Sequence, residues 1–195
     1  MKLGCIVMAA GASRRFGGDK LLAELEGKPL IRRTLEALPQ GEFARILAVV
    51  RREEVELLCG EMGIPTLRYG GGGHSMTIRL GMERMLDLDG CLFLPGDQPL
   101  CRRESIRALV HSFAAEPDLV CRLAWDGVAG SPVIFPKRLY PALLCLTGEQ
   151  GGMAAVPSDE NVRLVQARHF SELLDGDTPE ELERLRLWLN KMQNH

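Results

Sequence analysis

Residues 3–20 read LGCIVMAAGASRRFGGDK, in which a short apolar run leads directly into a basic, glycine-rich segment. The run Leu3–Ala9 has the length and unbroken hydrophobicity of a buried β-strand. Glycine and alanine in Ala9–Lys20 allow backbone N–H groups to approach an anion closely, while arginine and lysine supply positive charge. The stretch therefore predicts a strand followed by a phosphate-binding loop; the alternative is a solvated turn that is basic by chance.

Two widespread phosphate-binding motifs do not describe this loop. Walker A has the form Gly-x-x-x-x-Gly-Lys-Ser/Thr, but here Lys20 is followed by Leu21 and the glycine spacing differs. The dinucleotide fingerprint Gly-x-Gly-x-x-Gly is absent as well. The loop thus predicts binding of a phosphorylated ligand by a different arrangement of donors.

The rest of the chain alternates short apolar runs with longer amphipathic segments. We expect further strands at residues 45–51, 65–69, 91–94, 119–123, 128–135 and 162–166, and we expect Gly130 and Pro132 to interrupt the strand at 128–135. We expect helices at residues 29–38, 53–62, 75–86, 103–115, 136–146 and 178–192, the last opened by a capping box. This alternation predicts a three-layer, Rossmann-like α/β fold, with a mixed, mainly parallel sheet in a single domain of residues 1–195.

In such sheets ligands bind beyond the carboxyl ends of the strands. We therefore expect the site at the loops that follow Ala9, Tyr69, Leu94 and Gln166. The loop after Leu94 is the tight turn Pro95-Gly96-Asp97, which places a carboxylate at this edge of the sheet. Aspartate is also common in turns for purely local reasons, and that alternative stays open.

The composition is that of an ordinary globular protein. The 195 residues are 46% hydrophobic and 26% charged, and the formal net charge of −2 argues against a nucleic-acid-binding surface. No apolar run approaches the roughly 20 residues of a membrane-spanning helix, so we expect no membrane partner. The six cysteines include no Cys-x-x-Cys pair and are expected to be reduced, in a cytoplasmic protein.

Several blocks of the sequence together resemble one protein family. AAGASRRFGGDKLL at residues 9–22, with GKPL after it, is similar to the signature of the molybdenum cofactor nucleotidyltransferases, which belong to the GT-A-like nucleotidyltransferases. Similar blocks follow in order: GHSMTIRLG at 73–81, PGDQPL at 95–100, GSPVIF at 130–135, TGEQGG at 147–152 and DGDTPE at 175–180. Ala9-Ala10-Gly11 and Pro95-Gly96-Asp97 resemble the members that use CTP.

The resemblance implies a GT-A-type fold and transfer of CMP from CTP to molybdopterin, with release of pyrophosphate. It implies catalytic roles for Arg15, Lys20 and Asp97, with Arg14 beside them. The implied nucleotide-binding residues are Ala9, Ala10, Gly11, Ala12, Ser13, Arg15, Lys20, Gly73, Ser75, Thr77, Arg79, Pro95 and Gly96. The implied acceptor-binding residues are Gly130, Ser131 and Pro132.

The implied cofactor is Mg²⁺, which takes oxygen ligands and commonly binds one or two protein carboxylates together with substrate phosphates. Asp97 would be one ligand, and the second would be Asp175 or Asp177. Asp177 adjoins the helix-capping Thr178, so it also has a structural explanation as an acidic residue at a helix N-terminus.

The sequence departs from the family pattern at Glu149, where aspartate is usual, and at His74, where a small polar residue or glutamine is common. Four alternatives therefore remain. Two keep the chemistry, one with GTP as the nucleotide and one with a sugar or polyol phosphate as acceptor. The other two are a non-catalytic binding or insertion chaperone for molybdenum cofactor, and a nucleotide sensor with no second substrate. A molybdenum hydroxylase apoenzyme is the further partner that the resemblance suggests.

Overall fold

The apolar run Leu3–Ala9 forms strand β1, within the bounds that the sequence predicts. The computed structural model describes residues 1–13 and 15–193, with side chains up to residue 190; Arg14 lies outside the described residues. The remaining strands are β2 (Glu24–Leu25), β3 (Lys28–Pro29), β4 (Arg45–Val50), β5 (Thr66–Arg68), β6 (Gly90–Pro95), β7 (Val120–Trp125), β8 (Val128–Pro136) and β9 (Val162–Gln166).

The α-helices are α1 (Leu30–Ala37), α2 (Glu53–Glu61), α3 (Gly73–Met82), α4 (Arg103–Ala115), α5 (Tyr140–Leu144) and α6 (Pro179–Gln193). Short 3₁₀ helices are η1 (Lys20–Leu22), η2 (Gln40–Glu42), η3 (Lys137–Leu139), η4 (Gly152–Ala155) and η5 (Phe170–Leu173). Helices thus follow most strands, as expected for βαβ units.

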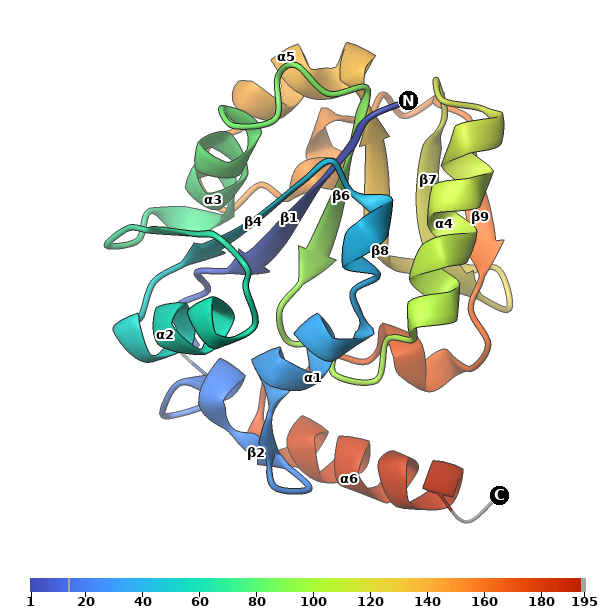
Figure 1. The fold of residues 1–195 in the computed structure, drawn as a ribbon. Coiled ribbons are helices and arrows are strands. Elements are labelled where there is room, and N and C mark those ends of the chain that lie inside the picture. Colours follow the sequence, from blue (N-terminus) through green and yellow to red (C-terminus); the bar gives the residue numbers. More distant parts are fainter. Residues whose placement is uncertain (14, 194–195) are drawn as a thin grey trace.

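One sheet of seven strands has the order β5-β4-β1-β6-β8-β7-β9 (Figure 1). Strand β1 pairs in parallel with β4 and β6, β4 with β5, and β7 with β9. Strand β8 is antiparallel to both of its neighbours, β6 and β7. The prediction of a mixed, mainly parallel sheet is confirmed.

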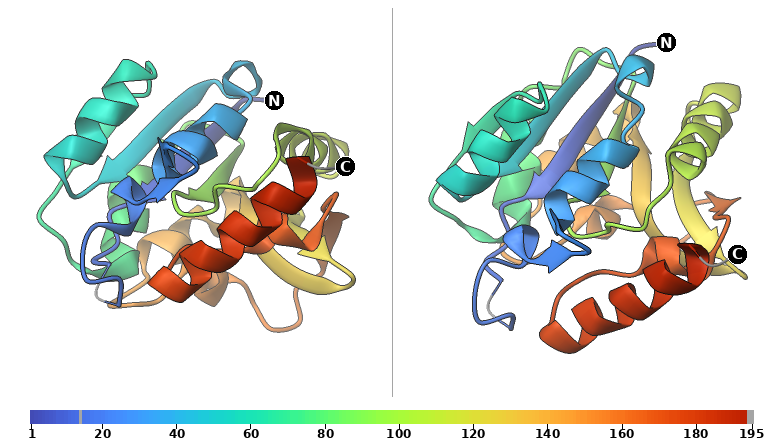
Figure 2. Two further views of the ribbon diagram at one scale, coloured as in Figure 1. Left: turned by 90° about the horizontal axis from the view of Figure 1, so that it is seen from below. Right: turned by 60° about the horizontal axis from the view of Figure 1, so that its bottom comes forward.

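Both faces of the sheet are covered by helices, so the molecule has three layers (Figure 2). Because side chains alternate along a strand, Cys5 and Val7 of β1 face one way and Ile6 the other. The first two pack with buried residues of α1, α2 and α4, whereas Ile6 packs with buried residues of α3 and α5. This confirms the three-layer α/β class.

Two elements differ from the prediction. The helix expected at 136–146 is a 3₁₀ turn followed by the short helix α5, because Pro136 still belongs to β8. Strand β8 is not interrupted by Gly130 and Pro132. Its pairing with β7 instead shifts register between Arg122 and Ala124, and Pro132, which has no N–H to donate, lies in that irregular stretch.

The sequence did not predict the hairpin formed by β2 and β3. Its turn residues Glu26 and Gly27 both have positive φ, at 51° and 71°, as in tight two-residue hairpin turns. Leu25 of this hairpin packs with Leu182 and Leu185 of α6 in a separate cluster of buried residues. Helix α6 thereby packs beneath the hairpin (Figure 1), and it directly follows the segment that carries Asp175 and Asp177.

Within the described residues, no helix combines the length and the apolarity that crossing a membrane requires. All six cysteines are free thiols, as expected, and only Cys145 is exposed.

Candidate functional site

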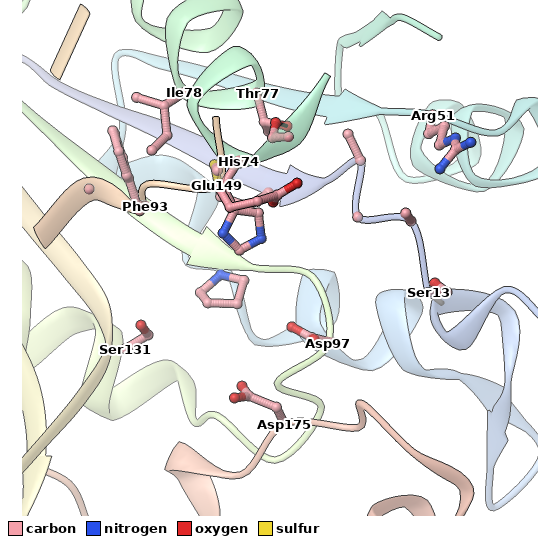
Figure 3. Close-up of a pocket in the computed structure, with 18 of the residues that line it drawn as sticks. Ser13, Arg51, His74, Thr77, Ile78, Phe93, Asp97, Ser131, Glu149 and Asp175 are labelled. Carbon is pink, nitrogen blue, oxygen red and sulfur yellow. Dashed lines mark hydrogen bonds between the residues drawn. The ribbon is translucent and has the colours of Figure 1, made fainter. Parts of the chain in front are cut away.

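The carboxyl ends of β1, β4, β5 and β6 open into one cleft with a volume of about 810 Å³ (Figure 3). This is the edge of the sheet that the strand-end rule predicts. Of the predicted site residues, those that line the cleft are Ala10, Gly11, Ala12, Ser13, Arg15, Lys20, Gly73, Thr77, Pro95, Asp97, Ser131, Asp175 and Asp177. Ala9, Ser75, Arg79, Gly96, Gly130 and Pro132 do not line it.

The glycine-rich loop is folded by local hydrogen bonds. Ser13 has a positive φ of 48°, its carbonyl accepts from Phe16 N at 3.1 Å, and its hydroxyl accepts from Lys20 N at 3.4 Å. Asp19 caps η1 by accepting from Leu21 N at 3.0 Å. These contacts bring the start and the end of the loop together at the mouth of the cleft.

The rim of this loop leaves backbone donors available. The N–H groups of Gly11, Ala12 and Ser13 have no hydrogen-bond acceptor among the residues that the structure describes. A Cβ placed at Gly11 would meet no protein atom within 4 Å, so this glycine keeps the space above the backbone open. Unpaired N–H groups facing open space are the donors that an anion requires.

Lys20 joins the loop to two carboxylates from distant parts of the chain. Its ammonium group is hydrogen-bonded to both Asp97 and Asp177, and Arg15 donates to Asp177 at 2.9 Å. Desolvation alone would lower the pKa of Lys20, but the carboxylates of Asp97 and Asp177 outweigh it and raise the pKa. For Asp177, desolvation is likewise outweighed by Lys20 and Arg15, which lower its pKa. The ammonium of Lys20 and the carboxylate of Asp177 are therefore both charged at neutral pH.

Asp97 is held in place by the backbone of the preceding residue. Gly96 N donates to Met8 O at 3.1 Å, and the buried hydroxyl of Thr34 donates to Gly96 O at 3.1 Å. A Cβ at Gly96 would lie 2.9 Å from Ile31 Cδ1 and 3.2 Å from Met8 O. Gly96 thus acts through packing, and Asp97 projects from this fixed turn into the cleft.

Asp175 lies at the same end of the cleft as Asp97 (Figure 3). Desolvation and the negative charges of Asp97 and Asp177 raise the pKa of Asp175 to about 6, although a hydrogen bond from Gln98 opposes the shift. This crowding of carboxylates is the electrostatic environment that a hard divalent cation relieves, and all three side chains offer the oxygen donors that such a cation prefers. Among the described residues, no group of three or more His, Cys, Asp or Glu side chains forms a ready-made metal site, so the fit requires ligand oxygens as well.

The glycine run 70–73 leads into α3 at the opposite wall of the cleft. Ser75 is buried and donates its hydroxyl to Gly148 O at 2.8 Å, which binds the helix start to a later loop. The hydroxyl of Thr77 contacts that of Tyr69 at 2.7 Å. Arg79 lies away from the cleft. Of the predicted α3 residues, Ser75 therefore has a structural contact, while Gly73 and Thr77 border the cleft.

The segment 130–132 is placed beside the carboxylates by the antiparallel direction of β8. Ser131 lines the cleft, whereas Pro132 is buried and Gly130 O accepts from Arg122 Nε at 3.1 Å. Of the three residues predicted to bind the acceptor, Ser131 thus lines the cleft, and the other two do not.

This geometry agrees with what a comparison of sequences finds. Residues 5–163 match the MobA-like NTP transferase domain. The chain belongs to this family. The resemblance to molybdenum cofactor nucleotidyltransferases is thereby confirmed at the level of the family, and this MobA-like protein is a member of a family of nucleotidyltransferases.

Named relatives of this MobA-like protein differ in their described activities. It is 27% identical to the purine catabolism protein PucB of Bacillus subtilis, over 93% of this chain and 94% of PucB. It is 32% identical to a probable molybdenum cofactor guanylyltransferase of Pyrococcus horikoshii, over 65% of this chain and 64% of that protein. It is 30% identical to the bifunctional enzyme IspD/IspF of Rhodospirillum rubrum, over 63% of this chain and 34% of that protein.

Solved structures show the same fold at low sequence identity. A nucleotidyl transferase from Methanothermobacter has a TM-score of 0.81 at 22% identity, covering 98% of this chain and 99% of that one. A Mycobacterium tuberculosis protein in complex with manganese has a TM-score of 0.79 at 20% identity, covering 96% of this chain and 99% of the other. The GT-A-like fold of the MobA-like protein is confirmed.

The cleft also contains residues that the sequence reasoning missed. Arg51 lines it directly after β4, a strand end that was not among the loops selected, although the same rule would have found it. Phe93 and Phe135 lie on its apolar side, and nothing distinguishes them in sequence from core residues. Glu149, noted only as a departure from the family pattern, projects into the cleft near His74 (Figure 3).

Proposed function

We propose that this protein transfers CMP from CTP to molybdopterin and releases pyrophosphate. The observation that carries the proposal is the cluster in which Lys20 of the glycine-rich loop pairs with Asp97 and Asp177, with Asp175 beside them. The cluster joins a cationic phosphate loop to a set of carboxylates in one cleft. A nucleotidyl transfer needs little covalent chemistry from the protein, because positioning and charge neutralisation supply most of the catalysis.

The triphosphate is assigned to the loop. The N–H groups of Gly11, Ala12 and Ser13 would donate to its oxygens, as would Lys20 and Arg15. The side chain of Arg15 is 75% exposed, so it can turn from Asp177 to a bound phosphate without loss of packing. Charge on the β- and γ-phosphates would be neutralised in the place where pyrophosphate forms.

Mg²⁺ is assigned to the carboxylate end of the cleft, with Asp97 and one or both of Asp175 and Asp177 as protein ligands. When bound there, the cation would neutralise phosphate charge and draw electron density from the α-phosphate. Lys20 would then pair with a carboxylate that does not bind the cation, because its ammonium contacts both Asp97 and Asp177.

The acceptor is assigned to the side of the cleft at Ser131. An oxygen of the acceptor phosphate would attack the α-phosphorus, the bond from that phosphorus to the β-phosphate oxygen would break, and its electron pair would leave with pyrophosphate. The acceptor phosphate is already ionised at neutral pH, so no protein base has to remove a proton. Ser131, Asp97 and Asp175 line the same part of the cleft (Figure 3), and the two reacting groups would meet between them.

Cytidine is favoured by the resemblance of Ala9-Ala10-Gly11 and Pro95-Gly96-Asp97 to CTP-using members. GTP is the second candidate, because several relatives are described as probable molybdenum cofactor guanylyltransferases. A polyol phosphate is the alternative acceptor, because one relative is described as 2-C-methyl-D-erythritol 4-phosphate cytidylyltransferase. A molybdenum hydroxylase would receive the finished cofactor.

The test is pyrophosphate release with each of the four NTPs, Mg²⁺, and molybdopterin or a polyol phosphate as acceptor. We expect turnover with CTP and molybdopterin, and Asp97→Ala should abolish it. Preference for GTP would reassign the nucleotide. Pterin binding with no turnover would favour a carrier of the cofactor, and failure to bind any NTP would exclude the proposed reaction.

A further inference from the structure

The turn formed by residues 147–150 places one carboxylate, that of Glu149, at the cleft. Gln150 Oε1 accepts from Thr147 N at 2.8 Å and from Thr147 Oγ1 at 3.2 Å, and Gln150 N donates to Thr147 O at 3.2 Å. Gly148 O accepts from Ser75 N at 3.2 Å and from the Ser75 hydroxyl at 2.8 Å. These bonds fix the backbone on both sides of Glu149.

The start of α3 is shaped to receive this turn. Gly73 has a φ of 80°, and a Cβ there would lie 2.5 Å from Gly148 O and 3.3 Å from Glu149 Oε1. Because the first of these contacts is with backbone, it could not be relieved by a change of side-chain rotamer. This close approach shows that the backbone of the turn packs directly against the start of α3.

An apolar wall lies along the same part of the cleft. The rings of Phe93 and Phe135 pack with their centroids 4.7 Å apart, and the backbone of Gly152 lies against both, since a Cβ there would be 2.7 Å from Phe135. Ile78 and Val133 extend this lining. Such a surface suits the face of a flat ring system better than a phosphate group.

Glu149 is exposed and has no hydrogen-bond or ion-pair partner among the described residues. Asp97 and Asp177 are paired with Lys20, whereas Glu149 pairs with no cation of the described residues, so it would repel a phosphate and its place does not suit triphosphate binding. Figure 3 shows Glu149 beside His74, with Phe93 and Ser131 to one side and Arg51 and Ser13 to the other. The group that Glu149 faces must offer hydrogen-bond donors next to an apolar surface.

We propose that Glu149 is a specificity-determining residue that binds the acceptor's heterocycle, accepting one hydrogen bond from a ring N–H and a second from the neighbouring exocyclic amino group. This donor pair is the edge of a 2-amino-4-oxopyrimidine ring, as in pterin, and a carboxylate receives it with both oxygens. The inference rests on the proposed function. Guanine carries the same edge, but Phe135 and Val133 of the apolar wall lie on β8, the strand that also carries Ser131 of the acceptor side, and Phe93 pairs with Val133.

The experiment compares pterin with lumazine, which has an oxo group in place of the amino group at C2. Binding of each to the full chain is measured by fluorescence titration, with and without CTP and Mg²⁺. The wild-type protein should bind pterin about 10-fold to 100-fold more tightly than lumazine, as expected for one charge-assisted hydrogen bond lost. Glu149→Gln should remove most of this preference, because its amide offers a donor where pterin also has one.

Glu149→Ala should weaken pterin binding by at least about 10-fold and leave lumazine binding nearly unchanged. Glu83→Gln, a matched change at an exposed residue after α3, should bind both ligands as the wild type does. Equal binding of pterin by wild type and both Glu149 variants, or no pterin binding by the wild type, would overturn the proposal.

A second measurement distinguishes pterin from guanine as the ring that Glu149 binds. It also distinguishes failure of this inference from failure of the proposed nucleotidyl transfer. GTP and CTP binding are measured on the same variants. If Glu149→Gln weakens the binding of GTP and not that of pterin, the carboxylate binds the nucleotide base and the assignment to the acceptor is wrong. Unchanged CTP binding together with altered pterin preference supports the inference; loss of all NTP binding in the wild type would instead refute the proposed reaction.

Discussion

The backbone N–H of Gly176 donates a 3.0 Å hydrogen bond to the backbone carbonyl of Asp97. This bond joins the turn after β6 to the segment before α6, and each segment carries carboxylates of the cleft. Gly176 is buried, and a Cβ there would lie 2.5 Å from Leu30 Cδ1 and 3.4 Å from Leu185 Cδ1. The absence of a side chain at Gly176 is therefore what allows Asp175 and Asp177 to approach Asp97.

Gly176→Ala should destabilise the protein by about 1–3 kcal/mol, because the added methyl group must displace packed leucine side chains. The same displacement moves Asp175 and Asp177, so turnover should fall more than nucleotide binding. Urea unfolding and steady-state kinetics measure the two effects. Gly60→Ala in α2, where a Cβ meets nothing within 4 Å, should instead leave stability equal or raise it by about 0.5–1 kcal/mol.

Lys20→Ala should lower kcat/KM for nucleotidyl transfer by about 10²–10³, the range seen when one charge-stabilising donor is removed. The reason is that its ammonium links the phosphate loop to Asp97 and Asp177. Lys28→Ala removes an exposed lysine that pairs with Glu36 and should change the rate little. Equal rates for the two variants would place Lys20 outside the chemistry.

Gly11→Ala should weaken NTP binding while leaving folding intact. The added methyl group meets no protein atom, so the melting temperature should stay within about 1–2 °C of the wild type. It would occupy the space in which a phosphate approaches the loop backbone, and we expect at least about a tenfold increase in Kd for CTP. Isothermal titration calorimetry measures the affinity; an unchanged Kd would contradict the role assigned to this loop.

Glu172→Gln should destabilise the fold by about 1–3 kcal/mol. The carboxylate is fully buried and accepts from Arg102 N at 3.0 Å, Arg168 N at 2.8 Å and His169 N at 3.1 Å. An amide offers only one acceptor oxygen and brings a donor against backbone N–H groups. Chemical denaturation tests this, and Glu180→Gln, at an exposed residue of α6, serves as the control.

Only Cys145 should react rapidly with a thiol reagent in the native protein. The five other cysteines are buried, and burial raises the pKa of Cys59 to about 11 and the pKa of Cys5 further. Since the thiolate is the reactive form, these thiols should react only as the protein unfolds. Titration with a chromogenic disulfide at pH 8 should give one fast equivalent, and Cys145→Ser should remove it.

Long, strongly patterned elements were predictable from the sequence. Strand β1, helix α4 and strand β9 have the bounds that the apolar pattern predicts, because each is long enough for its periodicity to be read. The hairpin of β2 and β3 was missed because strands of two residues carry no periodicity. Helix α5 was predicted too long because an apolar run does not distinguish the end of a buried strand from the start of a helix.

The candidate site was predictable in part, for a related reason. Asp97 and the glycine-rich loop could be selected because each directly follows a strong strand. Arg51 follows an equally clear strand and could have been selected by the same rule. Glu149 could not, because it lies in a turn that reaches the cleft only by docking on Gly73.

By itself, the sequence determined which residues end strands and therefore which loops gather at one edge of the sheet. That information is local, since hydrophobic periodicity and turn residues act within a few positions of the chain. Only the tertiary structure decided that Lys20 lies between Asp97 and Asp177 and that Asp175 joins them. Those contacts depend on the order of the strands and on the path of the chain beneath the β2–β3 hairpin. Both are determined by packing between side chains that are distant in sequence, which a local sequence pattern does not encode.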